Sequence, residues 1–125
     1  ARGLAAQFGP NCEIVVHDLA ASKVEHSIVH IENGHVTGRK VGDGPSKIVM
    51  EQMMSGNDDP QDQLAYLTRT PDGKILKSST IYIHDSNGKV TGILSINFDI
   101  SALLMVENAI SGITATHTPD RDEQR

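Results

Sequence analysis

The most regular alternation of apolar and polar residues lies near the end of the chain, between residues 89 and 100. Here Leu94 and Phe98 fall on one face of an extended chain, whereas Ser95 and Asn97 fall on the other. A period of two is typical of a half-buried antiparallel strand. The pattern therefore predicts a strand over residues 89–100.

The rest of the chain predicts a mixed order of strands and helices separated by turn residues such as Asn33-Gly34 and Pro71-Asp72-Gly73. The predicted elements are the end of a helix at 4–8, strands at 12–17, 27–32, 63–70, 74–84 and 89–100, a helix at 47–54 after Ser46, and a helix at 102–113 capped by Ser101. This order indicates an α+β fold, with a PAS-like five-stranded antiparallel sheet, short helices on one face and a C-terminal exit helix. A profilin-like fold would give a similar order.

The exit helix carries an apolar seam. Its members are spaced by three and four residues: Leu103, Val106, Ile110 and Ile113. We favour an ordinary amphipathic helix lying on the domain, because the seam spans less than two heptads; the alternative is a helix that forms a dimer or transmits a signal. Residues 114–125 are polar and predict a linker, so we place the domain at 1–113. We expect the chain to be a piece of a longer protein.

Charge and cysteine content narrow the classes of function. Lys and Arg total 11 and Asp and Glu total 16, which gives a net charge of −5. A domain that binds nucleic acid usually presents a basic face, so we expect no DNA or RNA contact by this chain itself, and no membrane partner. The single cysteine, Cys12, excludes an internal disulfide and fits a reducing compartment.

Four segments carry a family resemblance when they are taken in order: 8–18 (FGPNCEIVVHD), 31–39 (IENGHVTGR), 76–81 (LKSSTI) and 92–101 (GILSINFDIS). Together they resemble the YheO-like PAS domain of bacterial helix-turn-helix transcriptional regulators, the DauR/YheO family. The resemblance implies a cytoplasmic sensor domain, active as a homodimer, in a regulator whose DNA-binding domain is absent from this chain. Residues 49–63 match least well, so the resemblance does not identify the ligand.

A run of hydroxyl residues, Ser78-Ser79-Thr80, lies in the middle of a predicted strand. Ser78 and Thr80 point to one face and Ser79 to the other. These hydroxyls either line a pocket for a small polar ligand, together with Asn97, or pair with neighbouring strands and the backbone. The sequence leaves both readings open. The predicted ligand-binding residues are Ser78, Thr80, Asn97, Arg39, His17 and Tyr82.

Two further sites are weighed against structural roles. Arg39, in a glycine-rich loop, could clamp a carboxylate, although we favour a solvated loop arginine. His17, Asp18 and His35 could together hold a metal, but the six histidines show no ligand spacing, which favours structural roles.

Catalytic and cofactor chemistry has little support in the sequence. Cys12 lacks a basic neighbour, and the adjacent Glu13 would raise its pKa, so we expect a buried filler. Flavin would need aromatic walls that are scarce here, and no catalytic triad can be argued from spacing. We therefore expect no cofactor and no enzyme, but a PAS domain that senses a small polar metabolite, such as an amino acid. The rival hypotheses are a dimerisation module without ligand and, more remotely, a small enzyme.

Overall fold

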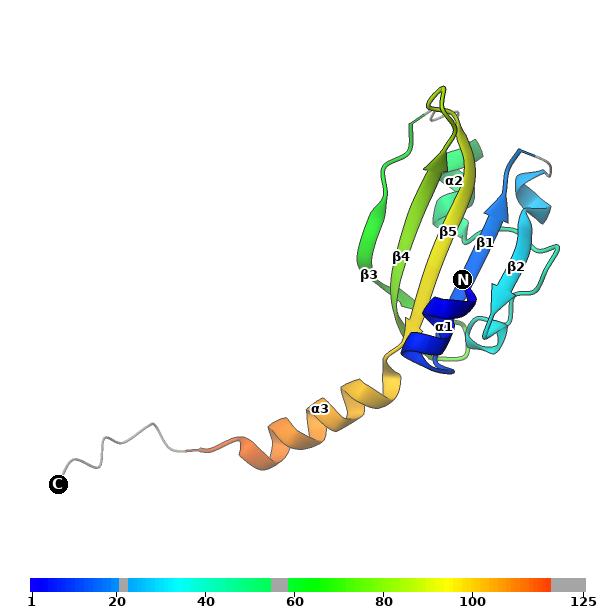
Figure 1. Ribbon diagram of the computed structural model, residues 1–125. Helices are drawn as coiled ribbons and strands as arrows, with labels where there is room; N and C mark the ends of the chain where they lie inside the picture. The colour runs from blue at the N-terminus through cyan, green and yellow to red at the C-terminus, as the bar shows by residue number, and fades with distance from the viewer. Residues whose placement is uncertain (21–22, 55–58, 118–125) are drawn as a thin grey trace.

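Five antiparallel strands form a single sheet in the computed structural model, which describes residues 1–20, 23–54 and 59–117 (Figure 1). The spatial order of the strands is β2-β1-β5-β4-β3, so the first and last strands of the sequence lie together at its centre. The elements are α1 (Arg2–Phe8), β1 (Cys12–Asp18), η1 (Val24–His26), β2 (Ile28–Glu32), η2 (Gly34–Val36), α2 (Lys47–Met54), β3 (Gln63–Arg69), β4 (Ile75–His84), β5 (Val90–Asp99) and α3 (Ser101–Thr114). The predicted PAS-like architecture is confirmed, and most predicted element ends lie within one or two residues of those observed.

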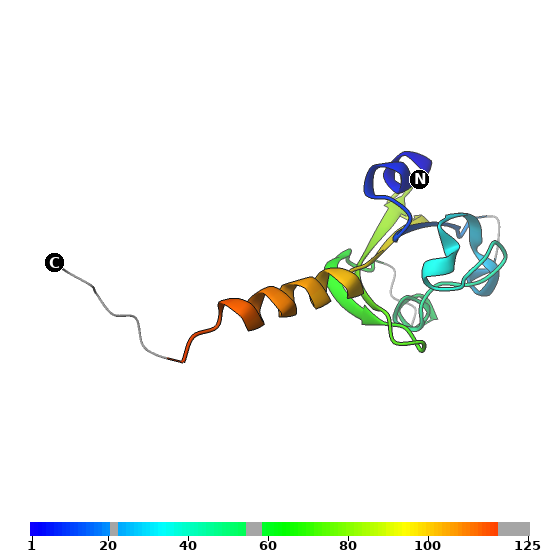
Figure 2. The ribbon, with the colours of Figure 1, turned by 90° about the horizontal axis from the view of Figure 1, so that it is seen from below.

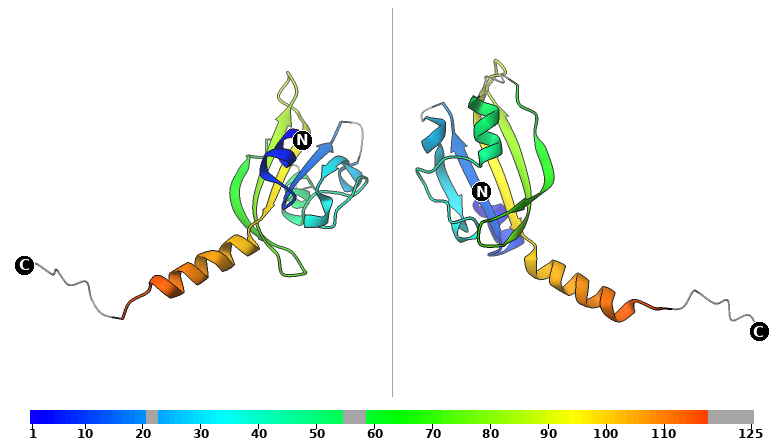
Figure 3. Two further views of the ribbon diagram at one scale, coloured as in Figure 1. Left: turned by 60° about the horizontal axis from the view of Figure 1, so that its bottom comes forward. Right: turned by 180° about the vertical axis from the view of Figure 1, so that it is seen from behind.

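The strand register sorts the side chains onto two faces. Asn97 of β5 lies opposite Glu13 of β1 and Ser78 of β4, and all three side chains share one face, called here the inner face. The neighbouring residues Cys12 and Phe98 point to the other, outer face. Helix α2 covers the inner face and α1 the outer face, so the short helices lie on both faces and not on one as predicted (Figures 1 and 3).

The outer face is apolar. Ala5 of α1, Cys12 and Ile14 are buried there, as was predicted for Cys12. Partly buried side chains pack around them: Leu94, Ile96 and Phe98. Phe8 lies on Phe98 with 6.3 Å between ring centroids and is about half exposed. Helix α1 therefore covers only part of this face.

The inner face combines an apolar end with a polar middle. At the apolar end, Val49 of α2 packs on Tyr82 and Ile93, which anchors the helix to the sheet. Towards the other end of the strands, four polar inner-face residues are buried beside the apolar Val15 and Leu76: Glu13, Ser78, Thr80 and Asn97. Buried polar groups are costly unless they are hydrogen-bonded, so this arrangement calls for specific partners.

Asn33 ties the sheet edge to the start of the central strand. It adopts the left-handed conformation that its turn requires, with φ of 57°. Its side-chain Nδ2 donates to the carbonyls of Gly9, at 3.2 Å, and Cys12, at 2.9 Å. β1 pairs with the edge strand β2 in antiparallel orientation, and Asn33 also leads directly into η2.

Helix α3 corrects two predictions. Ser101 does not cap it: the helix begins at Ser101, and the Ser101 hydroxyl instead accepts a hydrogen bond from the Ile75 N–H at 2.9 Å. The helix also does not lie on the domain. It projects away from the sheet and has no buried residue, and Ile113 is 85% exposed (Figure 2).

The predicted linker at 114–125 lies mostly outside the described residues. Within the described part of the chain, no helix has the length and apolar character that crossing a membrane requires.

Candidate functional site

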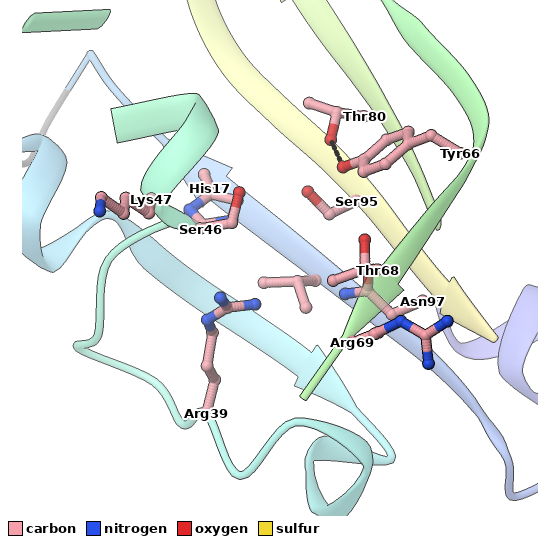
Figure 4. Close-up of a pocket in the computed structure, with 11 residues that line it drawn as sticks. His17, Arg39, Ser46, Lys47, Tyr66, Thr68, Arg69, Thr80, Ser95 and Asn97 are labelled. Carbon is pink, nitrogen blue, oxygen red and sulfur yellow. Dashed lines mark hydrogen bonds between the residues drawn. The ribbon is translucent and has the colours of Figure 1, made fainter. Parts of the chain in front are cut away.

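A cavity of about 240 Å³ opens on the inner face of the sheet (Figure 4). Strands β1, β3, β4 and β5, the loop after η2 and the start of α2 all contribute to it. Its lining consists of Val15, His17, Arg39, Ser46, Lys47, Tyr66, Thr68, Arg69, Thr80, Ser95 and Asn97. Ten of these eleven side chains are polar or charged, which suits a polar ligand better than an apolar one.

Four of the six predicted ligand-binding residues line this cavity: His17, Arg39, Thr80 and Asn97. The other two lie on the same face but outside the lining. Ser78 is buried and donates to Asn97 Oδ1 at 2.8 Å. Tyr82 is buried in the apolar cluster with Val49 and Ile93.

The hydroxyl run therefore divides between its two alternatives. Thr80 borders the cavity and shares a 2.8 Å hydrogen bond with the Tyr66 hydroxyl. The Ser78 hydroxyl donates a hydrogen bond to Asn97 on the neighbouring strand, which is the second of the two alternatives given for the run. Ser79 points to the outer face, where its hydroxyl accepts from the Ala65 N–H at 2.9 Å.

Sequence reasoning missed the remaining lining residues. Ser95 had a usable signal, because it alternates with Asn97 and its register places it opposite Thr80. Tyr66 and Thr68 share a face by the same alternation on β3, but the pairing of β3 with β4 was needed to orient them. The missed residues without such a signal are Val15, Ser46, Lys47 and Arg69.

A buried carboxylate holds the polar part of the inner face together. Glu13 is 0% exposed. Its Oε1 accepts from Asn97 Nδ2 at 2.8 Å, and its Oε2 accepts from the Thr37 hydroxyl at 2.6 Å and the Thr37 N–H at 3.2 Å. Together with Ser78 these contacts form a chain, called here the Glu13 network, which links β4, β5 and β1 to the loop after η2. Such charge-assisted hydrogen bonds are what a buried carboxylate needs.

His17 is buried beside the cavity and is held in one orientation. Its Nδ1 lies 2.8 Å from Ser27 Oγ. Burial, followed by the positive charge of Arg39, lowers the pKa of His17 from 6.5 to about 4. The imidazole is therefore neutral near pH 7, and no described residue hydrogen-bonds its Nε2.

The His17–Ser27 pair resembles a catalytic base with its nucleophile, but the geometry does not suit catalysis. Ser27 is fully buried and does not belong to the cavity lining. A substrate in the cavity would meet His17 and not the serine hydroxyl. The pair instead orients His17 towards the cavity.

Metal and thiol chemistry find no assembled site in the described part of the chain. There, no three His, Cys, Asp or Glu side chains gather in a way that could hold a metal. Cys12 lies on the outer face, and burial, with a smaller contribution from the Glu13 charge, raises the pKa of its thiol. A protonated, buried thiol is a poor nucleophile.

Comparison with known proteins identifies the family. The family model described as a YheO-like PAS domain matches residues 1–115. The protein YheO of Escherichia coli (strain K12) is 34% identical over 120 residues, which cover 94% of this chain and 48% of YheO. The transcriptional regulator DauR of Pseudomonas aeruginosa is 33% identical over 101 residues, which cover 81% of this chain and 44% of DauR. The chain thus spans about half the length of these relatives.

A solved structure supports the fold. An RNA-binding light-oxygen-voltage receptor aligns with a TM-score of 0.50 at 14% identity, over 92% of this chain and 37% of the receptor. At this identity the likeness concerns the fold alone. With an extensive family match and the sheet order described above, the chain belongs to the YheO-like PAS domain family.

Proposed function

We propose that this chain is the sensor domain of a DNA-binding transcriptional regulator, and that a small polar metabolite, an amino acid or an organic acid, binds in the inner-face cavity. The observation that carries the proposal is the composition of this cavity. Ten of its eleven lining residues are polar or charged, although the same strands supply apolar side chains to the outer face. A polar lining inside a small domain is costly for folding, and a bound polar ligand is a reason to keep it.

Several groups at the cavity are available to such a ligand. The hydroxyls of Thr68 and Ser95 form no hydrogen bond with other described residues, and neither does Nε2 of His17. Groups of this kind offer both donors and acceptors. The volume of about 240 Å³ lies below the ~300 Å³ lower end for drug-sized ligands, which favours a small metabolite.

The path to an output begins at β5. Ser95 and Asn97 line the cavity, and α3 starts at Ser101, four residues after Asn97 on the same chain segment. The Ser101 hydroxyl fixes the first turn of α3 to β4 through the Ile75 N–H. A ligand that binds one arrangement of β5 more tightly would shift the population of α3 orientations. DNA contact is assigned to another part of the full regulator, since this chain has a net charge of −5.

The proposed role in transcription implies a cytoplasmic location and a domain that binds a ligand without catalysis. A regulator of bacterial transcription works in the cytoplasm, and the single, buried cysteine suits that reducing compartment. We propose no catalysis, because the buried His17–Ser27 pair does not present a nucleophile to the cavity.

Thermal-shift screening tests the sensing role. The chain is screened against amino acids and organic acids, and at least one compound is expected to raise the melting temperature, because a ligand that binds only the folded state stabilises it. The variant Ser95→Leu, which fills the cavity, is expected to abolish the shift. Lys77→Leu introduces the same side chain on the outer face and is expected to retain it. If no compound stabilises the chain, or both variants respond alike, the proposal fails.

A second role, self-association, is supported by α3. The helix exposes the apolar seam predicted from the sequence to solvent: Leu103, Val106, Ile110 and Ile113. An exposed seam of this kind is typical of a helix that pairs with a second copy. We expect sedimentation velocity to show a dimer that Ile110→Glu dissociates, with Glu107→Gln as a control on the same helix. A chain that stays monomeric at millimolar concentration would contradict this role.

A further inference from the structure

The charges around the cavity are of one sign. Of the described residues that line it, Arg39, Lys47 and Arg69 carry positive charges and none carries a carboxylate. None of the three forms an ion pair with another described residue. The chain as a whole is acidic, with 16 acidic and 11 basic residues, so this local excess is not a consequence of composition. Cations gathered without partners around a cavity create a field that attracts anions.

Arg39 is the member of this group that is aimed into the cavity. Figure 4 shows its guanidinium rising from the loop towards His17. Arg39 is half-buried, whereas Lys47 and Arg69 are exposed. Its charge also acts on His17, where it contributes to the lowered pKa. A guanidinium in this position offers the planar pair of donors that a carboxylate accepts.

The loop that carries Arg39 is fixed and not free in solvent. The Arg39 N–H donates to Thr37 Oγ1 at 3.3 Å, and Thr37 is bound in turn to the buried Glu13. Lys74 Nζ donates to the carbonyls of His35 and Val36, both at 3.0 Å. These contacts hold the loop from β1 on one side and from the β3–β4 turn on the other.

Gly34 also helps to fix the loop that carries Arg39, because it allows a close backbone contact. The Cβ of any other residue at Gly34 would lie 2.8 Å from the Arg39 carbonyl oxygen and 3.2 Å from the Ile31 side chain. The Arg39 segment therefore folds closely over Gly34. The backbone that carries Arg39 is held in place before any ligand binds, which lowers the cost of ordering this segment on binding.

The side-chain oxygens best suited to bind a cation already accept hydrogen bonds from other residues. The Asn97 carbonyl oxygen accepts from Ser78, and both Glu13 oxygens accept from Asn97 and Thr37. An ammonium group in the cavity would lose its water and face positive charges, with only neutral hydroxyls and the neutral His17 imidazole as acceptors. That combination disfavours cationic ligands.

From these contacts we propose that the effector is a small metabolite of net negative charge, whose carboxylate pairs with Arg39. This inference rests on the proposed sensing function and names the chemical class of the ligand. Lys47 and Arg69 attract the anion at the rim, while the hydroxyls and His17 Nε2 bind its polar remainder. Diacids and hydroxy acids bind more tightly than zwitterionic amino acids of equal length, and diamines do not bind.

Matched ligand series test the class. Homologous diacids, ω-amino acids and diamines of the same chain lengths are titrated into the chain by calorimetry and thermal shift. The expected order is diacid first, amino acid second and no binding of diamine, with a diacid affinity that falls as salt screens the charges. If amino acids or diamines bind more tightly than every diacid, the anion inference is overturned while the sensing function stands. If no compound of any series binds, both fail.

Variants then locate the charge that matters. Arg39→Gln is expected to weaken the tightest diacid about ten- to hundredfold, because a hydrogen-bonded charge is lost. Arg39→Lys keeps the charge but loses the planar fork, and should restore part of the affinity. Lys77→Gln removes an equal charge from the outer face and should leave the affinity within about twofold. Equal losses in Arg39→Gln and Lys77→Gln, with both variants folded by circular dichroism, would contradict a carboxylate contact at Arg39.

Discussion

The inner and outer faces of the sheet come from the same strands but bury different kinds of side chain. On the outer face, apolar side chains such as Ile14 and Phe98 pack under α1, and part of the surface remains open. On the inner face, polar side chains such as Glu13 and Asn97 are buried, and each needs a particular partner. Burial and apolarity therefore do not coincide in this domain. The difference teaches that the inner face depends on matched hydrogen-bond partners, whereas the outer face follows ordinary apolar packing.

The largest expected effect comes from making the inner face resemble the outer one. Glu13→Leu removes the acceptor of three hydrogen bonds, from Asn97 Nδ2 and from the Thr37 hydroxyl and N–H. Each buried donor left without a partner costs ~1–3 kcal/mol, so we expect urea denaturation to show a loss of about 4 kcal/mol in the free energy of unfolding.

The adjacent position on the outer face supplies the control. Ile14→Leu keeps the volume of an apolar side chain and should cost less than about 1.5 kcal/mol. If Glu13→Leu is tolerated as well as Ile14→Leu, the two faces do not differ as described here.

Acid should weaken the inner face through His17. Its pKa is about 4 in the folded chain and near 6.5 when unfolded, so the unfolded state binds the extra proton between these values. Stability is fully present above pH 6.5 and is lost progressively as the pH falls towards 4. Because each pKa unit is worth ~1.4 kcal/mol, the His17 contribution to the loss is about 3.5 kcal/mol at most.

Comparison with a variant isolates this contribution. The free energy of unfolding is measured against pH for the chain and for His17→Gln, in which the slope between pH 4 and 6.5 should flatten. His35→Gln, at an exposed position, should retain the slope of the parent chain. An unchanged slope in His17→Gln would contradict the neutral, buried imidazole.

A smaller effect is expected where the inner face is joined to the Arg39 loop. Thr37→Val removes the 2.6 Å hydrogen bond from the hydroxyl to Glu13 but keeps the shape of the side chain. Hydrogen bonds to charged groups contribute ~1.5–3 kcal/mol, and we expect a loss of about 2 kcal/mol in thermal or urea unfolding. Ser86→Ala, in the exposed β4–β5 turn, is the control and should change little. A Thr37→Val chain as stable as this control would show that the Glu13 network does not hold the loop.

The smallest effect is local and electrostatic. Arg39→Gln removes the second cause of the lowered His17 pKa, so the pKa should rise but stay below 6.5, because burial is the larger cause. Titration followed by NMR of the imidazole measures this directly. Arg69→Gln, which also borders the cavity, serves as the charge-matched control. If only the control raises the His17 pKa, the Arg39 guanidinium does not lie where Figure 4 places it.

Local patterns in the sequence were sufficient for the order of elements, because alternation and turn residues act over a few neighbours. The β5 alternation placed Ser95 and Asn97 on one face, and the structure has them there. Alternation alone does not show which face of the sheet other segments of the chain cover. The apolar Leu94–Phe98 side suggested the core, yet the polar side is the one closed by α2 and the Arg39 loop.

The parts of the site that were not predicted depend on contacts between segments far apart in the sequence. The role of Glu13 rests on Asn97, 84 positions away, and on Thr37, 24 positions away. Arg39 was predicted as a ligand-binding residue, but a solvated loop arginine was favoured, because nothing in its own segment shows that Lys74 and Gly34 fix the loop. The projecting helix α3 was misplaced for a related reason: its short seam fits either the domain or a second copy.

The central claim is that the polar inner face, and not the open outer face, receives a small molecule. NMR of the labelled chain tests it most directly, with the metabolite that stabilises the chain most in the thermal-shift screen as the titrant. We predict the largest shifts at the Asn97 side-chain amide and the His17 imidazole, with little change at the methyl groups of Ile14 and Ile96. Shifts concentrated at Ile14 and Ile96, or no metabolite that shifts either face, would contradict it.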